Sequence, residues 1–466
     1  MKRVHLHLLA ALVLFSLLLQ ACGQQPDGST SQTGPITGAG TTQAGPVTLN
    51  VVFLESGNAP HPDTEWWNKI KAAVEMSNPN IKLNLQPITA DEGTYYNKLT
   101  DLLKSGTPPD IVYEDSFEIS SHVAANYLAP LDSYLAAWPD YQRQWFPSMQ
   151  GITTFNGHNY GIMNGTDIRG IWYNKTIFKQ AGLPATWQPA TWADVLTAAR
   201  TIKARVPGVT PLNLYAGSAM GEAASMQGFE MLLYGTNDPL YDYTTNKWIT
   251  SSKGFQDSLD FVKQVYNPAN PLGPSRDITL SSHAGSLAMK ELLPQGKLAI
   301  DIDGSWLPGA WEPGGAAPWP QWLQTMGVAA MPTQFGQAPK AVSLSGGWAY
   351  SITAQSKYKD QAFEVLKEAF SQQLLAGYDV AAGKITPRQD ILNVSAYNSL
   401  PMAATLTNMV SLSKFRPAFP AYPQISAQIC TATQQVIQGQ SSASAMAAYA
   451  QAVTGIAGGN NVEKRP

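Results

Sequence analysis

The amino-terminal part of the chain alternates between strand-like and helix-like patterns. Residues 47–54 predict a strand, apolar on one face throughout and on both faces toward its carboxyl end. A helix is expected from about Thr64, and a second alternating strand starts at Ile81. A further helix ends at Gly106, and residues 111–113 predict a short buried strand. This order predicts a parallel sheet with crossover helices.

The middle of the chain carries clear signals for helix ends. Residues 168–173 predict a largely buried strand, and Asn174 can cap the helix that follows, with Gly182 as its left-handed stop. Thr191 and Asp194 form a capping box for a helix at 192–205. Later patterns predict helices near 220–234, around 254–266 and toward the carboxyl terminus, a strand at 326–331, and a strand that ends in a loop at 296–306.

Acidic residues follow two of the predicted parallel strands. Glu55 comes directly after the first strand, and Glu114 and Asp115 come directly after the third. In open α/β sheets, ligands bind beyond the carboxyl ends of the strands. These three carboxylates are therefore candidate ligand-binding residues.

Composition narrows the choice of partner. The 466 residues are 44% hydrophobic, which gives room for two or three domains with sizeable cores. Charged residues make up only 14%, the net charge is −3, and no basic run occurs, which argues against nucleic acid. A ligand should be neutral or weakly charged. The six histidines form no metal-binding motif, so we expect neither a metal nor another cofactor.

The amino terminus predicts export. Residues 1–21 have the basic start and apolar core of a signal peptide. The tetrapeptide that ends in Cys22 resembles a bacterial lipobox, which implies lipid attachment at Cys22; an ordinary signal peptide is the alternative. Residues 22–46 are rich in Gly, Ser, Thr, Gln and Pro and predict a flexible linker. Cys430, the second cysteine, lies in an apolar helical pattern and is expected in the core.

Signals of catalysis are weak. Residues 377–384 approach a phosphate-binding loop, but the spacing is one residue too long and Ile385 replaces the hydroxyl residue. Residues 217–221 have the glycines of a nucleophile elbow with Ala219 at the nucleophile position. Asp301 and Asp303 share one strand face, as a glycosidase pair could. We expect no enzyme, with a carbohydrate-active enzyme as an alternative.

Dispersed motifs resemble one family. The sequence includes Y-G-I at 160–162, I-W-Y-N-K-T-I-F-K-Q-A-G-L at 171–183, T-W-A-D-V-L at 191–196, P-D-I-V at 109–112, G-K-L-A-I at 296–300 and S-G-G-W at 345–348. Together these motifs resemble the bacterial extracellular solute-binding proteins of family 1, the maltose-binding-protein type. Met163 departs from the pattern, since the family usually has proline there.

The resemblance implies a fold and a domain organisation. The fold is α/β, a two-lobed periplasmic-binding-protein fold (type II-like) with two parallel-rich sheets joined by a multi-strand hinge. The amino-terminal lobe is expected at 47–163 and 333–378, and the carboxyl-terminal lobe at 164–332 and 379–466. The Asp301/Asp303 pair becomes a feature of this scaffold.

The resemblance also implies a function and a binding site. The chain would capture a saccharide between its lobes, outside the cytoplasmic membrane, and deliver it to the membrane-spanning permease of an ABC importer. It would act as a lipid-anchored monomer. Sugars need aromatic platforms with polar groups around them. Besides the three strand-end carboxylates, the candidates are Asp167, Trp306, Gly347, Trp348, Arg388 and Tyr422. Trp172, inside a strand, is expected in the core.

Two other functions stay open on the same fold. The ligand could be a different solute, such as a glycerol phosphodiester, a peptide or a polyamine. A phosphate ligand is disfavoured by the low basicity of the chain. The protein could also be a sensor that presents its closed form to a membrane receptor.

Overall fold

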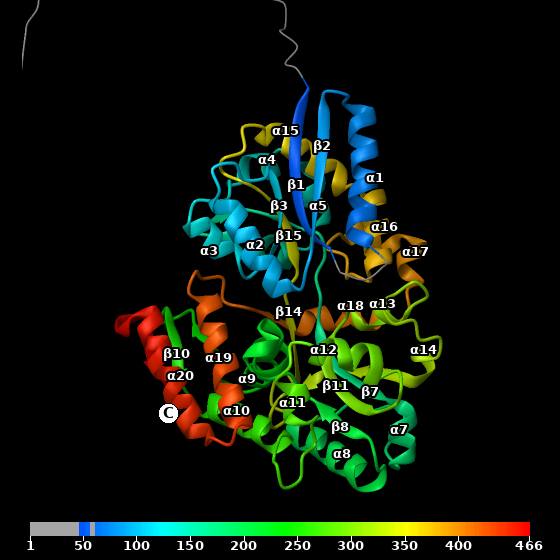
Figure 1. Ribbon diagram of the computed structural model, residues 1–466, viewed down its shortest axis with the longest axis vertical. Helices are drawn as coiled ribbons and strands as arrows, with labels where there is room; N and C mark the ends of the chain where they lie inside the picture. Colours follow the sequence, from blue (N-terminus) through cyan, green and yellow to red (C-terminus); the bar gives the residue numbers. More distant parts are fainter. Residues whose placement is uncertain (1–45, 56–60) are drawn as a thin grey trace, which may run out of the picture. The chain divides into compact units, whose positions relative to one another are not determined.

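The structure is a computed structural model that describes residues 46–55 and 61–466 (Figure 1). The signal peptide, Cys22 and nearly all of the expected linker lie outside the described residues. Among the helices of the described ranges, none is long and apolar enough to cross a membrane.

The first lobe is built on a five-stranded sheet. Its strands, in spatial order, are β2 (Ile81–Thr89), β1 (Val47–Glu55), β3 (Ile111–Asp115), β15 (Trp348–Ile352) and β6 (Ile162–Met163). β1 pairs in parallel with β2 and β3, whereas β15 runs antiparallel to β3 and β6. The predicted strands at 47–54, 81 and 111–113 are therefore confirmed.

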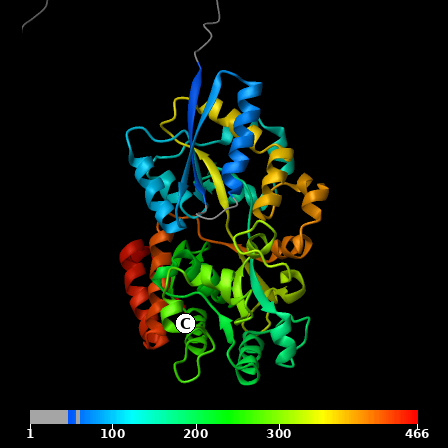
Figure 2. The ribbon, with the colours of Figure 1, turned by 45° about the vertical axis from the view of Figure 1, so that its right-hand side comes forward.

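Helices from distant parts of the chain cover this sheet. α1 (Pro62–Ser77) begins at a proline and buries Trp66, Trp67, Ile70 and Val74. Helices distant in sequence, α15 (Lys359–Ala369) and α16 (Gln372–Ala382), pack beside it (Figure 2). The remaining helices of the lobe are α2 (Glu92–Lys104), α3 (Ile119–Ala124), α4 (Asp132–Ala136), α5 (Pro139–Gln144), α6 (Pro147–Ile152) and α17 (Ser395–Asn398).

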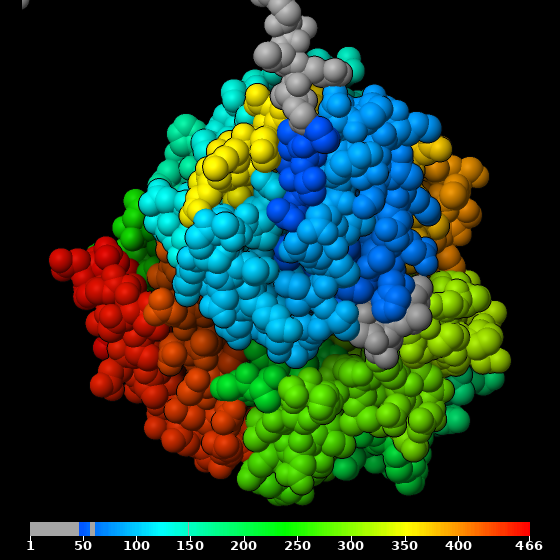
Figure 3. Space-filling view, turned by 45° about the horizontal axis from the view of Figure 1, so that its top comes forward, coloured from blue at the N-terminus to red at the C-terminus, as the bar shows by residue number. Residues whose placement is uncertain are grey.

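The second lobe is built on a four-stranded sheet. Its order is β12 (Met326–Ala329), β7 (Arg169–Asn174), β11 (Leu298–Gly304) and β8 (Thr210–Asn213). Its principal helices are α7 (Lys175–Gln180), α8 (Trp192–Arg205), α9 (Met231–Leu233), α10 (Lys253–Val265), α11 (Arg276–Thr279), α12 (Ala284–Leu287), α13 (Leu307–Trp311), α14 (Trp322–Thr325), α18 (Ala403–Met409), α19 (Tyr422–Ile437) and α20 (Ser442–Ala457). Two π-helices occur among the described residues, Ala224–Glu230 and Ala288–Leu292. In Figure 3 the red α20 lies against green segments of this lobe, consistent with its contacts with β10 and α10.

Short strands complete the fold. Those of the second lobe and the crossings are β9 (Tyr241–Asp242), β10 (Lys247–Ser251), β13 (Met331–Pro332), β14 (Ala341–Ser345), β16 (Ser413–Phe415) and β17 (Val462–Lys464), and the first lobe has the hairpin of β4 (Thr154–Phe155) and β5 (His158–Asn159). β14 pairs in parallel with β16, so residues 343–345 and 413–415 lie side by side.

The two-lobed α/β fold is confirmed, but the second sheet is not rich in parallel pairs. β7 is antiparallel to both β11 and β12, and only β11 and β8 pair in parallel. The reason lies in the path of the chain. β7 and β15 receive the chain from the other lobe, so each starts at the edge where its neighbours end. A strand that enters from that edge must run against them.

The local signals in the middle of the chain are confirmed. The Asn174 side chain accepts hydrogen bonds from the backbone N–H groups of Thr176 and Ile177, and Gly182 has a φ of +72°. Thr191 and Asp194 form the predicted capping box. These helix starts were predictable because capping depends on residues close in sequence.

The limits of the lobes stay a prediction, which the packing of buried side chains refines. Ile391 and Tyr397 belong to the first-lobe core, although the sequence assigned residues after 378 to the second lobe. Val342 and Leu344 belong to the second-lobe core, although the sequence assigned residues after 332 to the first. We propose that the chain recrosses near 345–347 and again near 398–402.

Candidate functional site

A cavity of about 230 Å³, the central cavity, lies between the two lobes. The first lobe contributes the start of α2, the end of β3 and the start of β15. The second lobe contributes the starts of β7 and of a π-helix and the loop after β11. Its lining residues are Glu92, Asp115, Asp167, Arg169, Glu222, Ala223, Met226, Gln227, Trp306, Gly347, Trp348, Lys384 and Arg416.

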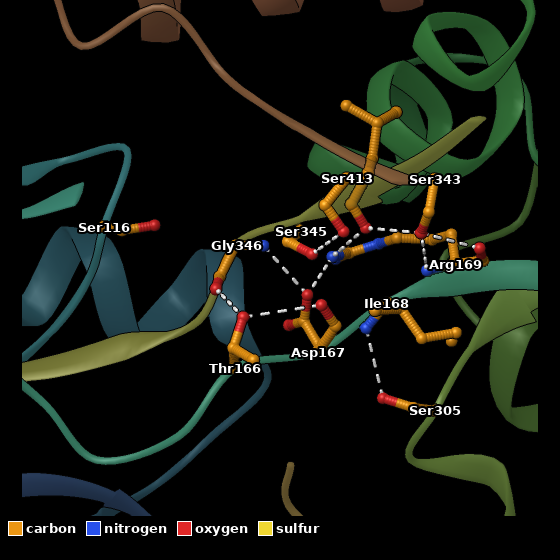
Figure 4. A network of polar contacts seen from close by, with 12 residues as sticks. Ser116, Thr166, Asp167, Ile168, Arg169, Ser305, Ser343, Ser345, Gly346 and Ser413 are labelled. Atoms are coloured by element: carbon orange, nitrogen blue, oxygen red, sulfur yellow. Dashed lines mark hydrogen bonds and ion pairs between the residues drawn. The ribbon is translucent and has the colours of Figure 1, made fainter. Parts of the chain in front are cut away.

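Asp167 ties two crossings together at one side of the central cavity (Figure 4). Its carboxylate accepts a hydrogen bond from Arg169 and another from the backbone N–H of Gly346, at 2.9 Å. The neighbouring Thr166 hydroxyl donates to the carbonyl oxygen of Gly346, at 3.0 Å. The Asp167 side chain is therefore held in place before any ligand binds.

Trp306 follows the end of β11, where a glycine makes room for its indole. A Cβ atom at Gly304 would lie 2.1 Å from the ring, so only glycine allows this placement. The Arg169 guanidinium lies 5.0 Å from the ring centroid, a cation–π contact. The Trp306 indole is thus held between the backbone at Gly304 and the Arg169 guanidinium.

Arg416 connects the two lobes behind the central cavity. Its guanidinium donates to Asp115 of the first lobe at 2.7 Å and to Glu222 of the second lobe at 3.2 Å. It also lies 4.8 Å from the centroid of the Phe117 ring. The Tyr422 hydroxyl donates to Glu222 at 2.8 Å. Carboxylates from both lobes therefore share one buried cation.

The charges of the central cavity nearly cancel. Four carboxylates (Glu92, Asp115, Asp167, Glu222) face three cations (Arg169, Lys384, Arg416). Desolvation by the surrounding protein, reinforced by the charge of Asp115, raises the pKa of Glu92 to about 7, so this side chain is partly protonated at neutral pH. Burial also raises the pKa of Asp115, against the opposing effect of Arg416. Such a cavity suits an uncharged ligand that both donates and accepts hydrogen bonds.

Five of the predicted site residues line the central cavity. They are Asp115, Asp167, Trp306, Gly347 and Trp348. Trp348 is only 7% exposed, because its indole stacks on Tyr113 with the ring centroids 4.8 Å apart. That each of the five contacts a ligand stays a prediction.

Four predicted site residues lie elsewhere. Glu114 is fully buried against His122, 3.0 Å away, because neighbouring residues of β3 point to opposite faces and only Asp115 faces the cavity. Glu55 accepts a hydrogen bond from the backbone of Thr64 at the start of α1. The other two residues have structural contacts. Arg388 forms ion pairs with Asp140 and Asp390, and the Tyr422 hydroxyl donates a hydrogen bond to Glu222.

The other expectations for single residues can now be compared. Trp172 and Cys430 are buried, as expected of core residues. Asp301 and Asp303 are buried as well, and they accept hydrogen bonds from Asn213 and Tyr215 at 2.9 and 2.8 Å. This pair lies within the core of the second lobe.

Several lining residues were missed by sequence reasoning. They are Glu92, Arg169, Glu222, Gln227, Lys384 and Arg416. Glu92 could have been found, since it opens the helix that follows the second predicted strand. Gln227 lies within a π-helix and Glu222 just before it, and a π-helix is a feature common at functional sites but without a sequence signal.

The fold and the cavity define a class of protein. Two α/β lobes and, between them, a cavity with an indole and balanced charges are the features of a two-lobed ligand-binding protein. The comparisons agree, because residues 58–374 match the bacterial extracellular solute-binding proteins. The chain belongs to this family, and the resemblance seen in the sequence is confirmed.

Individual relatives give the same result. An ABC transporter solute-binding protein from Thermotoga lettingae, solved with alpha-D-tagatose, has a TM-score of 0.74 at 24% identity, over 88% of this chain and 99% of that one. This likeness shows a shared fold. A binding protein of Brucella abortus is 23% identical over 86% of this chain and 90% of its own. A lactose-binding protein of Rhizobium radiobacter is 23% identical over 70% of this chain and 69% of its own.

Proposed function

We propose that the protein captures a neutral saccharide in the central cavity and delivers it to the permease of an ABC importer. The observation that carries this proposal is the fixed indole of Trp306 beside the Asp167–Arg169 pair. An indole packs on the C–H face of a sugar ring, and the paired charges accept from and donate to its hydroxyl groups. The proposed role is binding without catalysis.

The charge balance of the central cavity favours a saccharide over the other ligands considered. A polyamine would require an excess of carboxylates, and a phosphodiester would favour several cations that are not already paired. Arg169 and Arg416 are both engaged with carboxylates, so among the described lining residues Lys384 alone would be left for a phosphate group. The relatives named for tagatose and lactose support the same ligand class.

Delivery to a permease rests on the two-lobed fold. Ligand contacts from both lobes stabilise the closed state relative to the open one, and a partner can distinguish the two. About 5.5 kcal/mol of differential affinity moves such an equilibrium from 1:99 to 99:1. The expected Cys22 lipid would hold a monomer at the outer face of the membrane, within reach of the permease.

Isothermal titration with a panel of mono- and oligosaccharides tests this proposal. At least one sugar should bind, and Trp306→Ala should weaken binding at least about tenfold, since loss of about 1.5 kcal/mol of stacking corresponds to that factor. Trp187→Ala is the matched control. Trp187 is also a partly buried indole of the second lobe, but it packs on Tyr173 and Phe178 away from the central cavity.

The two variants separate ligand binding from folding. Trp187→Ala should lower stability and leave the affinity unchanged. Wild-type affinity in a folded Trp306→Ala variant would remove the indole from the site. A panel in which no sugar binds would contradict the saccharide itself.

A further inference from the structure

A second cavity, the side cavity, has a volume of about 300 Å³. One wall is α13 with the glycine- and proline-rich loop after it, in the second lobe. The other is formed by the end of α16, residues 383–385, the segment at 397–401 and the start of α18. The side cavity therefore lies between the two lobes, as the central cavity does.

The lining of the side cavity is mostly apolar. Most of its residues are Gly, Pro, Ala, Val, Ile or Leu, and its two charged residues are Glu312 and Lys384. The Glu312 carboxylate already accepts a hydrogen bond from the Trp322 indole at 2.9 Å. The Tyr397 hydroxyl accepts one from a backbone N–H at 3.0 Å. A polar ligand group would find few partners here, whereas an apolar group would be well accommodated.

Lys384 lies at the boundary between the two cavities. It lines both of them, and Ser305 of the side cavity is the neighbour of Trp306 in the central cavity. The carbon stem of Lys384 packs beside Gly165, where an added Cβ atom would lie 3.2 Å from it. Its ammonium group forms no ion pair with another described residue. A polar donor thus separates a polar cavity from an apolar one.

Resting on the proposed saccharide function, we propose that the side cavity binds the apolar aglycone of a glycoside. The sugar would occupy the central cavity, and the Lys384 ammonium would donate to an oxygen at the junction. The volume is sufficient, because an apolar cavity of about 150 Å³ already binds benzene. A free sugar would leave this apolar surface in contact with water, whereas an aryl or alkyl glycoside would bury it.

Calorimetry with matched glycosides tests the inference on the purified protein. The probes are methyl and phenyl α- and β-glycosides of glucose, galactose and any sugar that the panel identifies. The phenyl glycoside should bind at least tenfold more tightly than the methyl glycoside of the same sugar. Equal affinities would overturn the inference and leave the saccharide function intact.

Filling the side cavity gives the complementary test. Ala403→Phe and Gly309→Leu add side chains to opposite walls, and each should remove the phenyl advantage while leaving the methyl glycoside affinity unchanged. Ala404→Phe is the matched control, because Ala404 is exposed and does not line the side cavity. A phenyl advantage that survives in both filled variants would contradict the inference. Failure of every glycoside and free sugar to bind would instead contradict the proposed function.

Discussion

Arg416→Met should lower the free energy of unfolding by about 3 kcal/mol. Methionine keeps the length of the stem but removes the hydrogen bonds to Asp115, Ser116 and Glu222, at 2.7, 2.9 and 3.2 Å. Removing one partner of a buried ion pair costs about 3–5 kcal/mol, since the other charge stays buried. We expect the lower end of this range, because Asp115 keeps the Tyr96 hydroxyl at 3.1 Å and Glu222 keeps the Tyr422 hydroxyl.

Urea unfolding followed by circular dichroism measures this loss, and a compensated variant identifies its cause. Adding Asp115→Asn and Glu222→Gln to Arg416→Met removes the uncompensated charges, so most of the lost stability should return. A loss below about 1 kcal/mol in Arg416→Met would refute the reasoning. The reasoning would also be refuted if the triple variant were as unstable as Arg416→Met. The lost stability would then come from the packing of Arg416 on Phe117.

Two further predictions concern the site and its surroundings. Gly304→Ala should displace the Trp306 ring, weaken sugar binding at least about tenfold and cost about 1–3 kcal/mol of stability. Gly377→Ala is the control: outside its own helix backbone the added methyl group meets no atom within 4 Å, so affinity should be unchanged in the same titration. Unchanged affinity in Gly304→Ala would contradict the packing argument. Burial, reinforced by Glu222, raises the pKa of Glu230 from 4.5 to about 8, so the folded protein retains a proton that the unfolded chain releases. The free energy of unfolding should therefore fall from pH 4.5 to 8, and urea unfolding of Glu230→Gln should show a smaller fall; equal slopes would exclude this cause.

Much of the fold was predictable because its signals are local. The strand at 47–54, the Asn174 cap and the Thr191–Asp194 capping box depend on residues within a few positions of one another. The limits of the lobes were harder to place. Tyr397 packs in the first lobe and Leu344 in the second because of contacts with residues far away in sequence, which no periodic pattern records.

The sequence could not tell which of two adjacent carboxylates faces the ligand. Glu114 and Asp115 were equal candidates in the sequence, yet β3 points one toward His122 and the other toward the central cavity. A pattern of alternation identifies two faces but does not say which one meets the ligand. Arg416 carried no signal at all, because its partners Asp115 and Glu222 are about 300 and 200 positions away.

The direction of two strands explains why a rule based on strand ends found only part of the site. Ligands are expected beyond the carboxyl ends of parallel strands, and Asp115 ends β3 while Trp306 follows β11. β15 and β7 run the other way, so Trp348 pairs with Asp115 and Arg169 pairs with Gly304 in the register of the sheets. The first residues of the two entering strands therefore lie at the same edge as the last residues of their neighbours. In a two-lobed fold, the starts of the entering strands are as much candidates for ligand contact as the ends of the others.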